Sequence, residues 1–287
     1  MNVQGRDCTL VVLKSHTEMS IPYSEETIRE NVSLLEENPS IEGKGNVKTI
    51  RTSSGAVGCV VSPLTIGAAP LLLCLAFGEV RLSAHVSGTS NIYKHTIDLV
   101  PMDDTGPFGL LQDRGSEKKY YAACRVKSFE LRILRDEAIK LKLDIYSERA
   151  PVSYPVLDQF KSDRGERFKG ENVKYRINDR EYKNIYGVTL TGKKESGTKT
   201  EIWIRRILEK DTDLPETIEN LTITARLLRD CYEERHFGQL RITLKSLVLA
   251  HDETSVECDD SVIGPLRYFV NGDLTAEVFT TGSESIP

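Results

Sequence analysis

Residues 128–145, SFELRILRDEAIKLKLDI, decide the fold class of this chain. In the first half of the stretch, apolar side chains alternate one by one with polar ones: Phe129, Leu131 and Ile133 against Ser128, Glu130 and Arg132. After a short turn the alternation resumes, with Ile139, Leu141, Leu143 and Ile145 as its apolar members. Successive side chains of a strand point to opposite faces, so this pattern predicts an antiparallel hairpin with one buried and one wet face.

Similar alternation fills the second half of the chain, where we expect strands at 173–177, 185–190, 201–208, 221–227, 240–244 and 266–279. Asn178-Asp179 reads as a turn after the first of these strands, with 185–190 pairing back. Asn271-Gly272 is the preferred dipeptide of a two-residue type I′ hairpin, so a final hairpin is expected there.

The first half adds short helices to its strands. Residues 24–38 suit a helix that Ser24 caps and that Asn38-Pro39 ends. Residues 56–78 form an almost uncharged run of membrane-spanning length, but its prolines and glycine favour a buried strand, a turn and an apolar helix between Pro70 and Gly78.

Other segments of the first half complete the expected order of elements. Residues 1–20 read as an arm or first strand, 47–51 and 56–62 as two strands, 92–100 as a strand, and 101–119 as a long loop. His95 falls on the apolar face of its strand, which indicates a core or interface histidine.

The polar, proline-containing stretch 147–170 marks the expected domain boundary. We therefore expect residues 1–150 to form a β domain with an arm and one or two short helices, and 151–287 to form a second β domain. Both halves end in alternating strands, and the sequence leaves open whether the second is a duplicate of the first.

The bulk composition is that of an ordinary soluble protein: 287 residues, 39% hydrophobic and 28% charged, with a net charge of −5. This acidic balance disfavours a surface built to grip nucleic acid. The six cysteines form no Cys-x-x-Cys pair, so we expect a reducing compartment.

No convincing catalytic, cofactor or metal site emerges, and we predict that the chain is not an enzyme. The acidic run from His251 to Asp260 lacks the spacing of a calcium loop, and Gly43-Lys44-Gly45 lacks most of a phosphate loop. The paired acids at 103–104 and 211–213 read as turn formers. Trp203 shares a strand face with Arg205, which indicates a core tryptophan beneath an arginine stem.

The order of elements resembles the tail tube proteins of long-tailed phages and tailocins. The resemblance runs through IPYSEETIRENVSLLEENPSIEGKG, GAVGCVVSPLTIGAAPLLLCLAFG, NIYKHTIDLVP and the 128–145 hairpin, and through FKGENVKYRINDREYKNIYGVTL and GPLRYFVNGDLTAEV in the second half. The long 101–119 loop departs from the family pattern.

The resemblance implies tandem β-sandwich or barrel domains that join edge to edge into rings, as hexamers or as trimers with pseudo-sixfold symmetry. The rings would stack through the arm and long loops, contact tail proteins such as the tape measure, and let DNA pass without specific binding. Acidic wall positions would be Glu130, Asp144 or Glu277.

Localisation would be the virion of a phage or prophage, after assembly in the host cytoplasm and without membrane contact. Three alternatives stay open: another tail component, such as a terminator or distal tail protein; a β-sandwich module that binds carbohydrate or protein; and a hydrolase whose site carries no recognised motif.

Overall fold

The computed structural model describes residues 9–14, 17–37, 48–86, 92–101, 104–115, 117–153, 161–162, 165–194, 199–207, 214–227, 238–250 and 262–281. Within these ranges the side chains of 32–37, 48–54, 79, 81–82, 153, 161–162, 199, 205–207, 262–265 and 281 are not described.

Strands dominate the chain, as the alternation predicts, and the described residues hold one α-helix. In the first half the elements are β1 Thr9–Lys14, β2 Thr17–Ile21, β3 Glu25–Glu26, β4 Arg29–Glu37, β5 Lys48–Pro63, α1 Ala69–Phe77, β6 Gly78–His85, β7 Ile92–Leu99, β8 Phe108–Asp113, β9 Lys118–Leu134 and β10 Lys140–Ser147. In the second half they are β11 Val152–Ser153, β12 Lys161–Ser162, the short 3₁₀ turn η3 Gly170–Asn172, β13 Val173–Ile177, β14 Arg180–Tyr182, β15 Ile185–Lys193, β16 Lys199–Ile207, β17 Thr217–Arg226, β18 Gly238–Leu249, β19 Val262–Val270 and β20 Leu274–Thr281.

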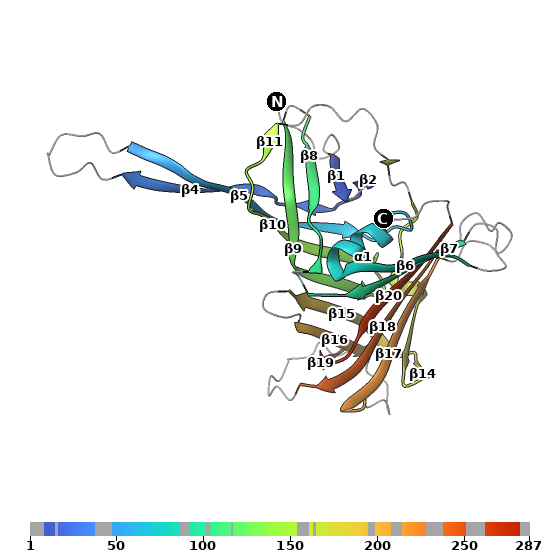
Figure 1. Cartoon of the computed structure of the whole chain (residues 1–287). Coiled ribbons are helices and arrows are strands. Elements are labelled where there is room, and N and C mark those ends of the chain that lie inside the picture. Colours follow the sequence, from blue (N-terminus) through green and yellow to red (C-terminus); the bar gives the residue numbers. More distant parts are fainter. Residues whose placement is uncertain are drawn as a thin grey trace.

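The long strand β9 links two sheets (Figure 1). Its first part pairs with β8 and β11, and β8 continues through β1 to β2. Its second part pairs with β10 on one side and with β15 on the other. Ala123, at φ 54°, lies at the bulge where the register with β8 shifts, so the strand turns there from one sheet into the other.

The 128–145 hairpin is confirmed. In the pairing of β9 with β10, Leu131 lies opposite Leu141 and Phe129 opposite Leu143, and all four side chains are buried. β10 then pairs with β5, and β5 with β4. Because β10 ends opposite Ala56, β4 and the first half of β5 continue alone as a two-stranded ribbon that projects from the body (Figure 1).

β18 organises the second half. It pairs with β17 along one edge, and along the other edge with β19 and then with β20. From β17 the sheet runs to β13 and β14, from β19 to β16 and β15, and from β20 to β7 and β6.

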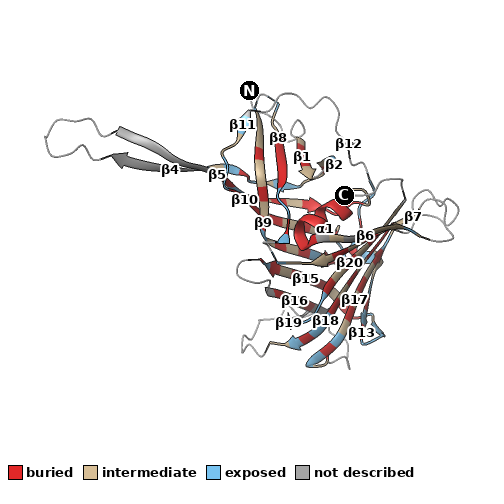
Figure 2. Ribbon diagram, in the orientation of Figure 1, coloured by how far each residue is buried: buried red, intermediate tan, exposed pale blue. Residues whose placement is uncertain are grey.

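α1 has the predicted ends and the predicted burial. Pro70 lies in its first turn, and Gly78 follows its last residue at φ 123°, a conformation that residues with a side chain rarely adopt. All nine residues of the helix are buried against β6, β7, β9 and β20 (Figure 2). In the part of the chain that the structure describes, no helix has the length and apolar character needed to cross a membrane.

The helix predicted at 24–38 is wrong. This segment forms β3 and β4, both antiparallel to β5. The backbone N–H groups of Ser24 and Thr27 donate to the carbonyl oxygens of Val61 and Cys59, at 2.8 and 3.0 Å. Backbone pairing with a long neighbouring strand thus outweighs the local capping signals.

The hairpin predicted at Asn271-Gly272 is also wrong. β19 and β20 do not pair with each other but follow one another along β18, and neither Asn271 nor Gly272 has the positive φ of a type I′ turn. They form a bulge opposite Ser246, whose own φ is 55°. Glycine suits this position because a Cβ on Gly272 would lie 2.7 Å from the Lys245 carbonyl oxygen.

Three smaller predictions need correction. The stretches 47–51 and 56–62 belong to one strand, β5, and the expected loop 101–119 contains β8. The Asn178-Asp179 turn is confirmed, with φ 47° and 66°, but it returns into β14, whereas Ile185–Leu190 pairs with β9 and β16. The alternative of a first strand within residues 1–20 is confirmed for the described residues, because β1 pairs with β2 and β8 and its residues Leu10, Val11 and Val12 are buried.

The mainly β fold class is confirmed, and the division into 1–150 and 151–287 stays a prediction. Strands from the two segments pair directly, β15 with β9 and β20 with β7. One connected set of buried apolar side chains runs from Leu10 in β1 to Val278 in β20 (Figure 2).

Candidate functional site

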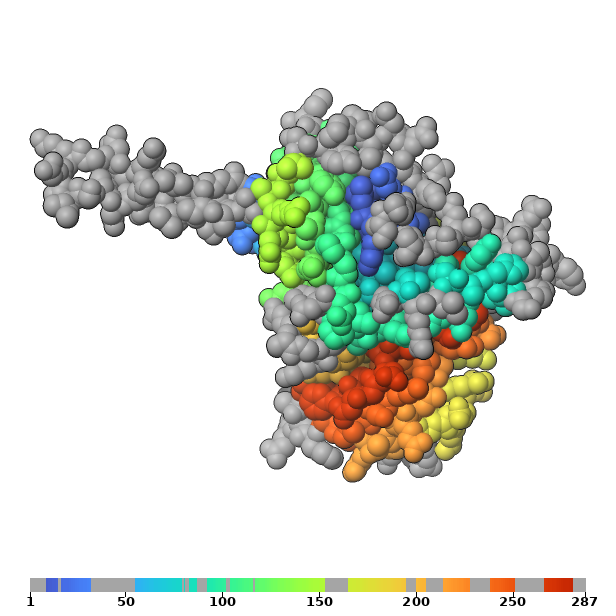
Figure 3. All heavy atoms as spheres, in the orientation of Figure 1, coloured from blue at the N-terminus to red at the C-terminus, as the bar shows by residue number. Residues whose placement is uncertain are grey.

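A polar depression of about 1140 Å³ lies on the outward face of the second half, and we call it the basic furrow. It is lined by η3, the β13–β14 hairpin, the start of β15, and the polar faces of β17, β18 and β20. Figure 3 shows these strands from outside, with β17, β18 and β20 in orange to red beside the yellow β13–β14 segment.

Strand alternation builds this face. In β13, Tyr175 and Ile177 are buried, whereas Lys174 and Arg176, which alternate with them, are exposed. Cross-strand register then aligns the polar residues in rows: Arg176, Thr222, Thr243 and Thr275 in one, and Lys174, Thr224, Arg241 and Glu277 in the next. The furrow therefore offers ranks of hydroxyl groups flanked by cations.

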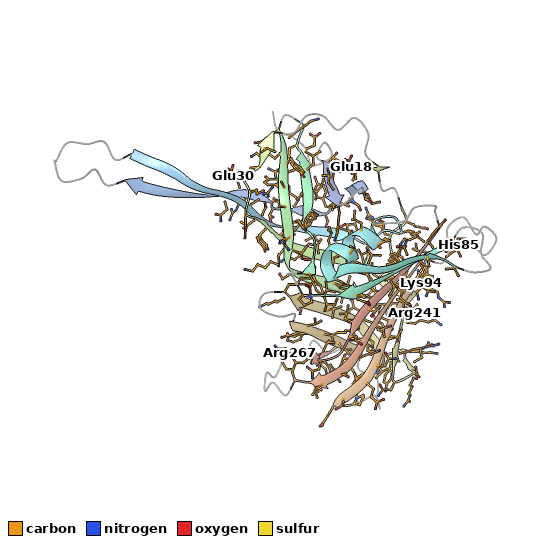
Figure 4. The ribbon with its side chains drawn as sticks, viewed as in Figure 1. Glu18, Glu30, His85, Lys94, Arg241 and Arg267 are labelled. Carbon is orange, nitrogen blue, oxygen red and sulfur yellow. The ribbon has the colours of Figure 1, made fainter. Side chains whose placement is uncertain are left out.

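The furrow carries more positive than negative charge, although the whole chain is acidic. Its cations are Arg135, Lys174, Arg176, Lys183, Arg226 and Arg241, and its acids are Glu171, Asp179, Glu181 and Glu277. Two of these acids are already paired: Glu277 contacts Lys94 and Arg241, and Glu171 contacts Lys169. Figure 4 shows Lys94 of β7 and Arg241 of β18 close together.

Three furrow cations form no ion pair with a described acid, although Glu181 lies opposite Arg176 across the β13–β14 pair. Lys174, Arg176 and Lys183 form no ion pair there. Arg135 donates to the Lys183 carbonyl oxygen at 2.8 Å, and Arg226 to Gln239 Oε1 at 3.1 Å, so both keep their charge unneutralised. The cationic side chains are therefore available to an anionic partner.

Two lining residues also hold buried polar atoms without a partner in the described part of the chain. These atoms are Tyr175 Oη and Asn220 Oδ1. Tyr175 is only 5% exposed, and burial raises the pKa of its hydroxyl group. A buried polar group without a partner costs about 1–3 kcal/mol, so an occupant that satisfies these atoms would recover that free energy.

A second cluster lies on another face, on β16 and β19. The Arg267 guanidinium makes two hydrogen bonds to the Glu201 carboxylate, at 2.9 and 3.1 Å, and lies 5.3 Å from the Trp203 ring centre and 5.0 Å from that of Phe269. Phe269 is 40% exposed, and Val248 across from it is exposed too. Figure 4 shows Arg267 well apart from Lys94 and Arg241. Clusters of Trp, Phe and Arg are enriched at the centres of protein interfaces.

A buried basic group lies at the end of α1. Lys194, 1% exposed, donates from Nζ to the Phe77 carbonyl oxygen at 3.2 Å, at the negative end of the helix. Lys14 Nζ lies 3.2 Å from Cys74 Sγ close by. Burial, and then the Lys14 charge, lower the pKa of Lys194 to about 8.

His95 is in the core, as its strand face predicts. Its Nδ1 lies 2.9 Å from Ser83 Oγ, and its Nε2 lies 3.3 Å from Thr280 Oγ1. Burial lowers the pKa of His95 below its usual value. Both ring nitrogens have hydroxyl partners, so a structural role accounts for this histidine.

Two of the three acidic wall candidates lie on adjacent strands, and the third lies several strands away in the pairing order. Glu130 and Asp144 lie on neighbouring strands of the β9–β10 hairpin, where Asp144 accepts from Ser128 Oγ and lies 3.7 Å from Lys142 Nζ. Glu277 lies in the basic furrow, between two cations. The surface around Glu277 is therefore not an acidic wall, because cations lie on both sides of this residue.

Several sequence candidates fall outside the described residues: Gly43-Lys44-Gly45, Asp103, 211–213 and 251–260. Within the described ranges, no cluster of three His, Cys, Asp or Glu side chains has metal-site geometry. Trp203 is only partly buried and stacks with Arg267, so the interpretation as a core residue needs correction. Sequence reasoning missed both the furrow and this contact because they depend on strand neighbours that the sequence does not give.

A scan of the sequence against models of known protein families finds no match, and a search among curated proteins also finds none.

Proposed function

We propose that this chain is a structural, self-assembling subunit of a phage-type tail tube, which forms stacked rings around a channel for DNA. The observation that carries the proposal is the β4–β5 ribbon. β4 pairs only with β5 among the described strands, and β5 has no other partner before Ala56. A two-stranded ribbon is marginally stable alone in water, so a contact with a neighbouring molecule would stabilise it.

Open sheet edges support the same proposal. Within the described part of the chain, β6 pairs only with β7, and β14 only with β13. The unpaired backbone groups of an edge strand can form hydrogen bonds with an edge strand of another molecule. A head-to-tail contact that closes into a ring gives every such edge a partner. The Arg267 cluster adds an exposed aromatic contact of the kind that interfaces use.

The basic furrow favours a second candidate, a β-sandwich binding module. A furrow with unpaired cations is a feature of recognition sites, and a binding module needs no self-assembly. The two functions differ in the state of the purified protein: rings or tubes in negative-stain images support the tube subunit. A monomer at every concentration would refute the tube subunit and favour the module.

Shortening the ribbon tests its role directly. Residues 33–53 are replaced by Asn-Gly, which joins Val32 to Ser54, two residues that lie opposite one another. We expect a folded body with an unchanged circular dichroism spectrum and no rings. Rings that persist would show that the ribbon is not the assembly contact. Deleting residues 1–20 is unsuitable as a test, because Leu10, Val11 and Val12 are in the core.

A further inference from the structure

We propose that the basic furrow is the receiving half of a contact between copies, and that it binds the acidic segment 251–260 of a second copy. This inference rests on the proposed self-assembly and names the surfaces that meet. The segment HDETSVECDD joins β18 to β19 in sequence and contains Asp252, Glu253, Glu257, Asp259 and Asp260, with no lysine or arginine.

Charge is the first argument. In the furrow, Lys174, Arg176 and Lys183 form no ion pair among the described residues, and Arg135 and Arg226 contact only neutral oxygen atoms of those residues. The furrow acids Asp179 and Glu181 form no ion pair among the described residues, and Glu181 lies opposite Arg176 across the β13–β14 pair. Two acids against these five cations still leave the furrow with an excess of positive charge. A segment with five carboxylates and no cation is complementary to it.

The unpaired polar atoms indicate a peptide rather than a purely anionic polymer. Tyr175 Oη can donate to a carboxylate or carbonyl oxygen, whereas Asn220 Oδ1 can only accept a hydrogen bond. A peptide supplies carboxylates and backbone N–H groups together, and a polyphosphate supplies acceptors alone. The threonine hydroxyl groups at 222, 243 and 275 both donate and accept along the same row.

The geometry of the strands favours a second copy over the same chain. Leu249 ends β18 about 20 Å beyond Thr243, at about 3.3 Å per strand residue. Val262 begins β19 a further ~20 Å away, because Tyr268 is the residue that pairs with Leu249. To reach the furrow at the level of Thr243, the chain would have to run about 20 Å back from Leu249 and then about 40 Å forward to Val262, about 60 Å in all. Residues 250–261, which connect Leu249 to Val262, span at most about 45 Å.

A peptide titration tests the furrow without requiring assembly. The probe is a labelled peptide of residues 250–261 with Cys258 replaced by Ser, and the control peptide carries Asn and Gln in place of its five acids. Fluorescence anisotropy should show saturable binding of the acidic peptide, at least about tenfold tighter than the control and weaker at high salt. Equal binding of the two peptides, or no saturation of either, would overturn the proposal.

Variants locate the binding. Lys174→Gln together with Arg176→Gln should weaken binding of the acidic peptide at least about tenfold. Lys142→Gln is the matched control, because Lys142 is a partly exposed strand lysine of the β9–β10 hairpin outside the furrow, and it should leave binding unchanged. The same loss in both proteins would indicate non-specific charge attraction and would refute the furrow as the site.

A charge exchange in the full chain tests the contact between copies. Lys174→Glu and the pair Asp259→Lys with Asp260→Lys should each reduce assembly in sedimentation velocity, and their combination in one chain should restore it. If wild-type rings form and these variants change nothing, the inference falls and the tube proposal stands. If the peptide binds to the furrow but the wild-type chain never assembles, the tube proposal is refuted. A second copy of the chain is then also excluded as the occupant of the furrow.

Discussion

Replacing Lys194 with methionine should remove a pH dependence of stability that the wild-type chain shows between about pH 8 and 10.5. Lys194 is 1% exposed, and its ammonium donates to the Phe77 carbonyl oxygen at the end of α1. Burial and the nearby Lys14 charge lower its pKa from 10.5 to about 8. Burying the charged amine therefore destabilises the folded state.

The sign and size of the effect follow from proton linkage. Between pH 8 and 10.5 the unfolded chain holds the Lys194 proton more tightly than the folded chain does, so stability rises with pH in this window. One pKa unit is 1.36 kcal/mol, so the rise from this residue is about 3 kcal/mol. Methionine fills a similar volume without the charge, and it loses one hydrogen bond worth about 1 kcal/mol.

Urea unfolding at a series of pH values measures the effect. From pH 7 to above pH 10.5, the free energy of unfolding of the wild type should rise by about 3 kcal/mol relative to that of Lys194→Met, because only the wild type releases the Lys194 proton. Lys142→Met, at a partly exposed lysine, is the control and should follow the wild type. Parallel curves for wild type and Lys194→Met would contradict a lowered pKa of Lys194 in the folded chain.

Three further changes have defined outcomes. Asn178→Ala should cost about 2 kcal/mol in urea unfolding, because its side chain accepts from two backbone N–H groups and its φ is 47°; an unchanged midpoint would contradict this. Gly78→Ala should lower the melting temperature strongly, since its φ is 123° and a Cβ would overlap Thr105, whereas Gly106→Ala meets no atom within 4 Å and serves as control. Cys124, whose pKa burial raises to about 12, should resist iodoacetamide at about pH 8 in the native protein and react once it is unfolded, and native labelling would refute its burial.

Local signals predicted the elements whose neighbours in space are also neighbours in sequence. The β9–β10 hairpin follows from alternation alone, because its two strands are joined by a short turn and pair directly, so that their apolar side chains fall on the same face of the sheet. α1 follows from Pro70, Gly78 and the apolar run between them. The Asn178-Asp179 turn follows from residues that tolerate positive φ.

Local signals failed where a distant strand offered backbone hydrogen bonds. Ser24 and the acids after it resemble a helix start, yet their segment pairs with β5, and Glu26 instead binds Arg114 at 2.8 Å. Asn271-Gly272 resembles a hairpin turn, yet β18 is long enough to hold both flanking strands in line. Pairing satisfies many backbone groups at once, so it outweighs a preference of a few residues.

Alternation and composition are enough to predict that this chain is mainly β, that one short helix is buried, and that polar residues occupy alternate positions of the strands. Which polar residues become neighbours depends on how the strands pair in the folded chain. Arg176, Thr222, Thr243 and Thr275 come from four strands, and their alignment depends on cross-strand register. Side-chain period is a local property of the backbone, whereas register and strand order are set by packing of the whole core, so the furrow and the Arg267 cluster emerge only in the folded chain.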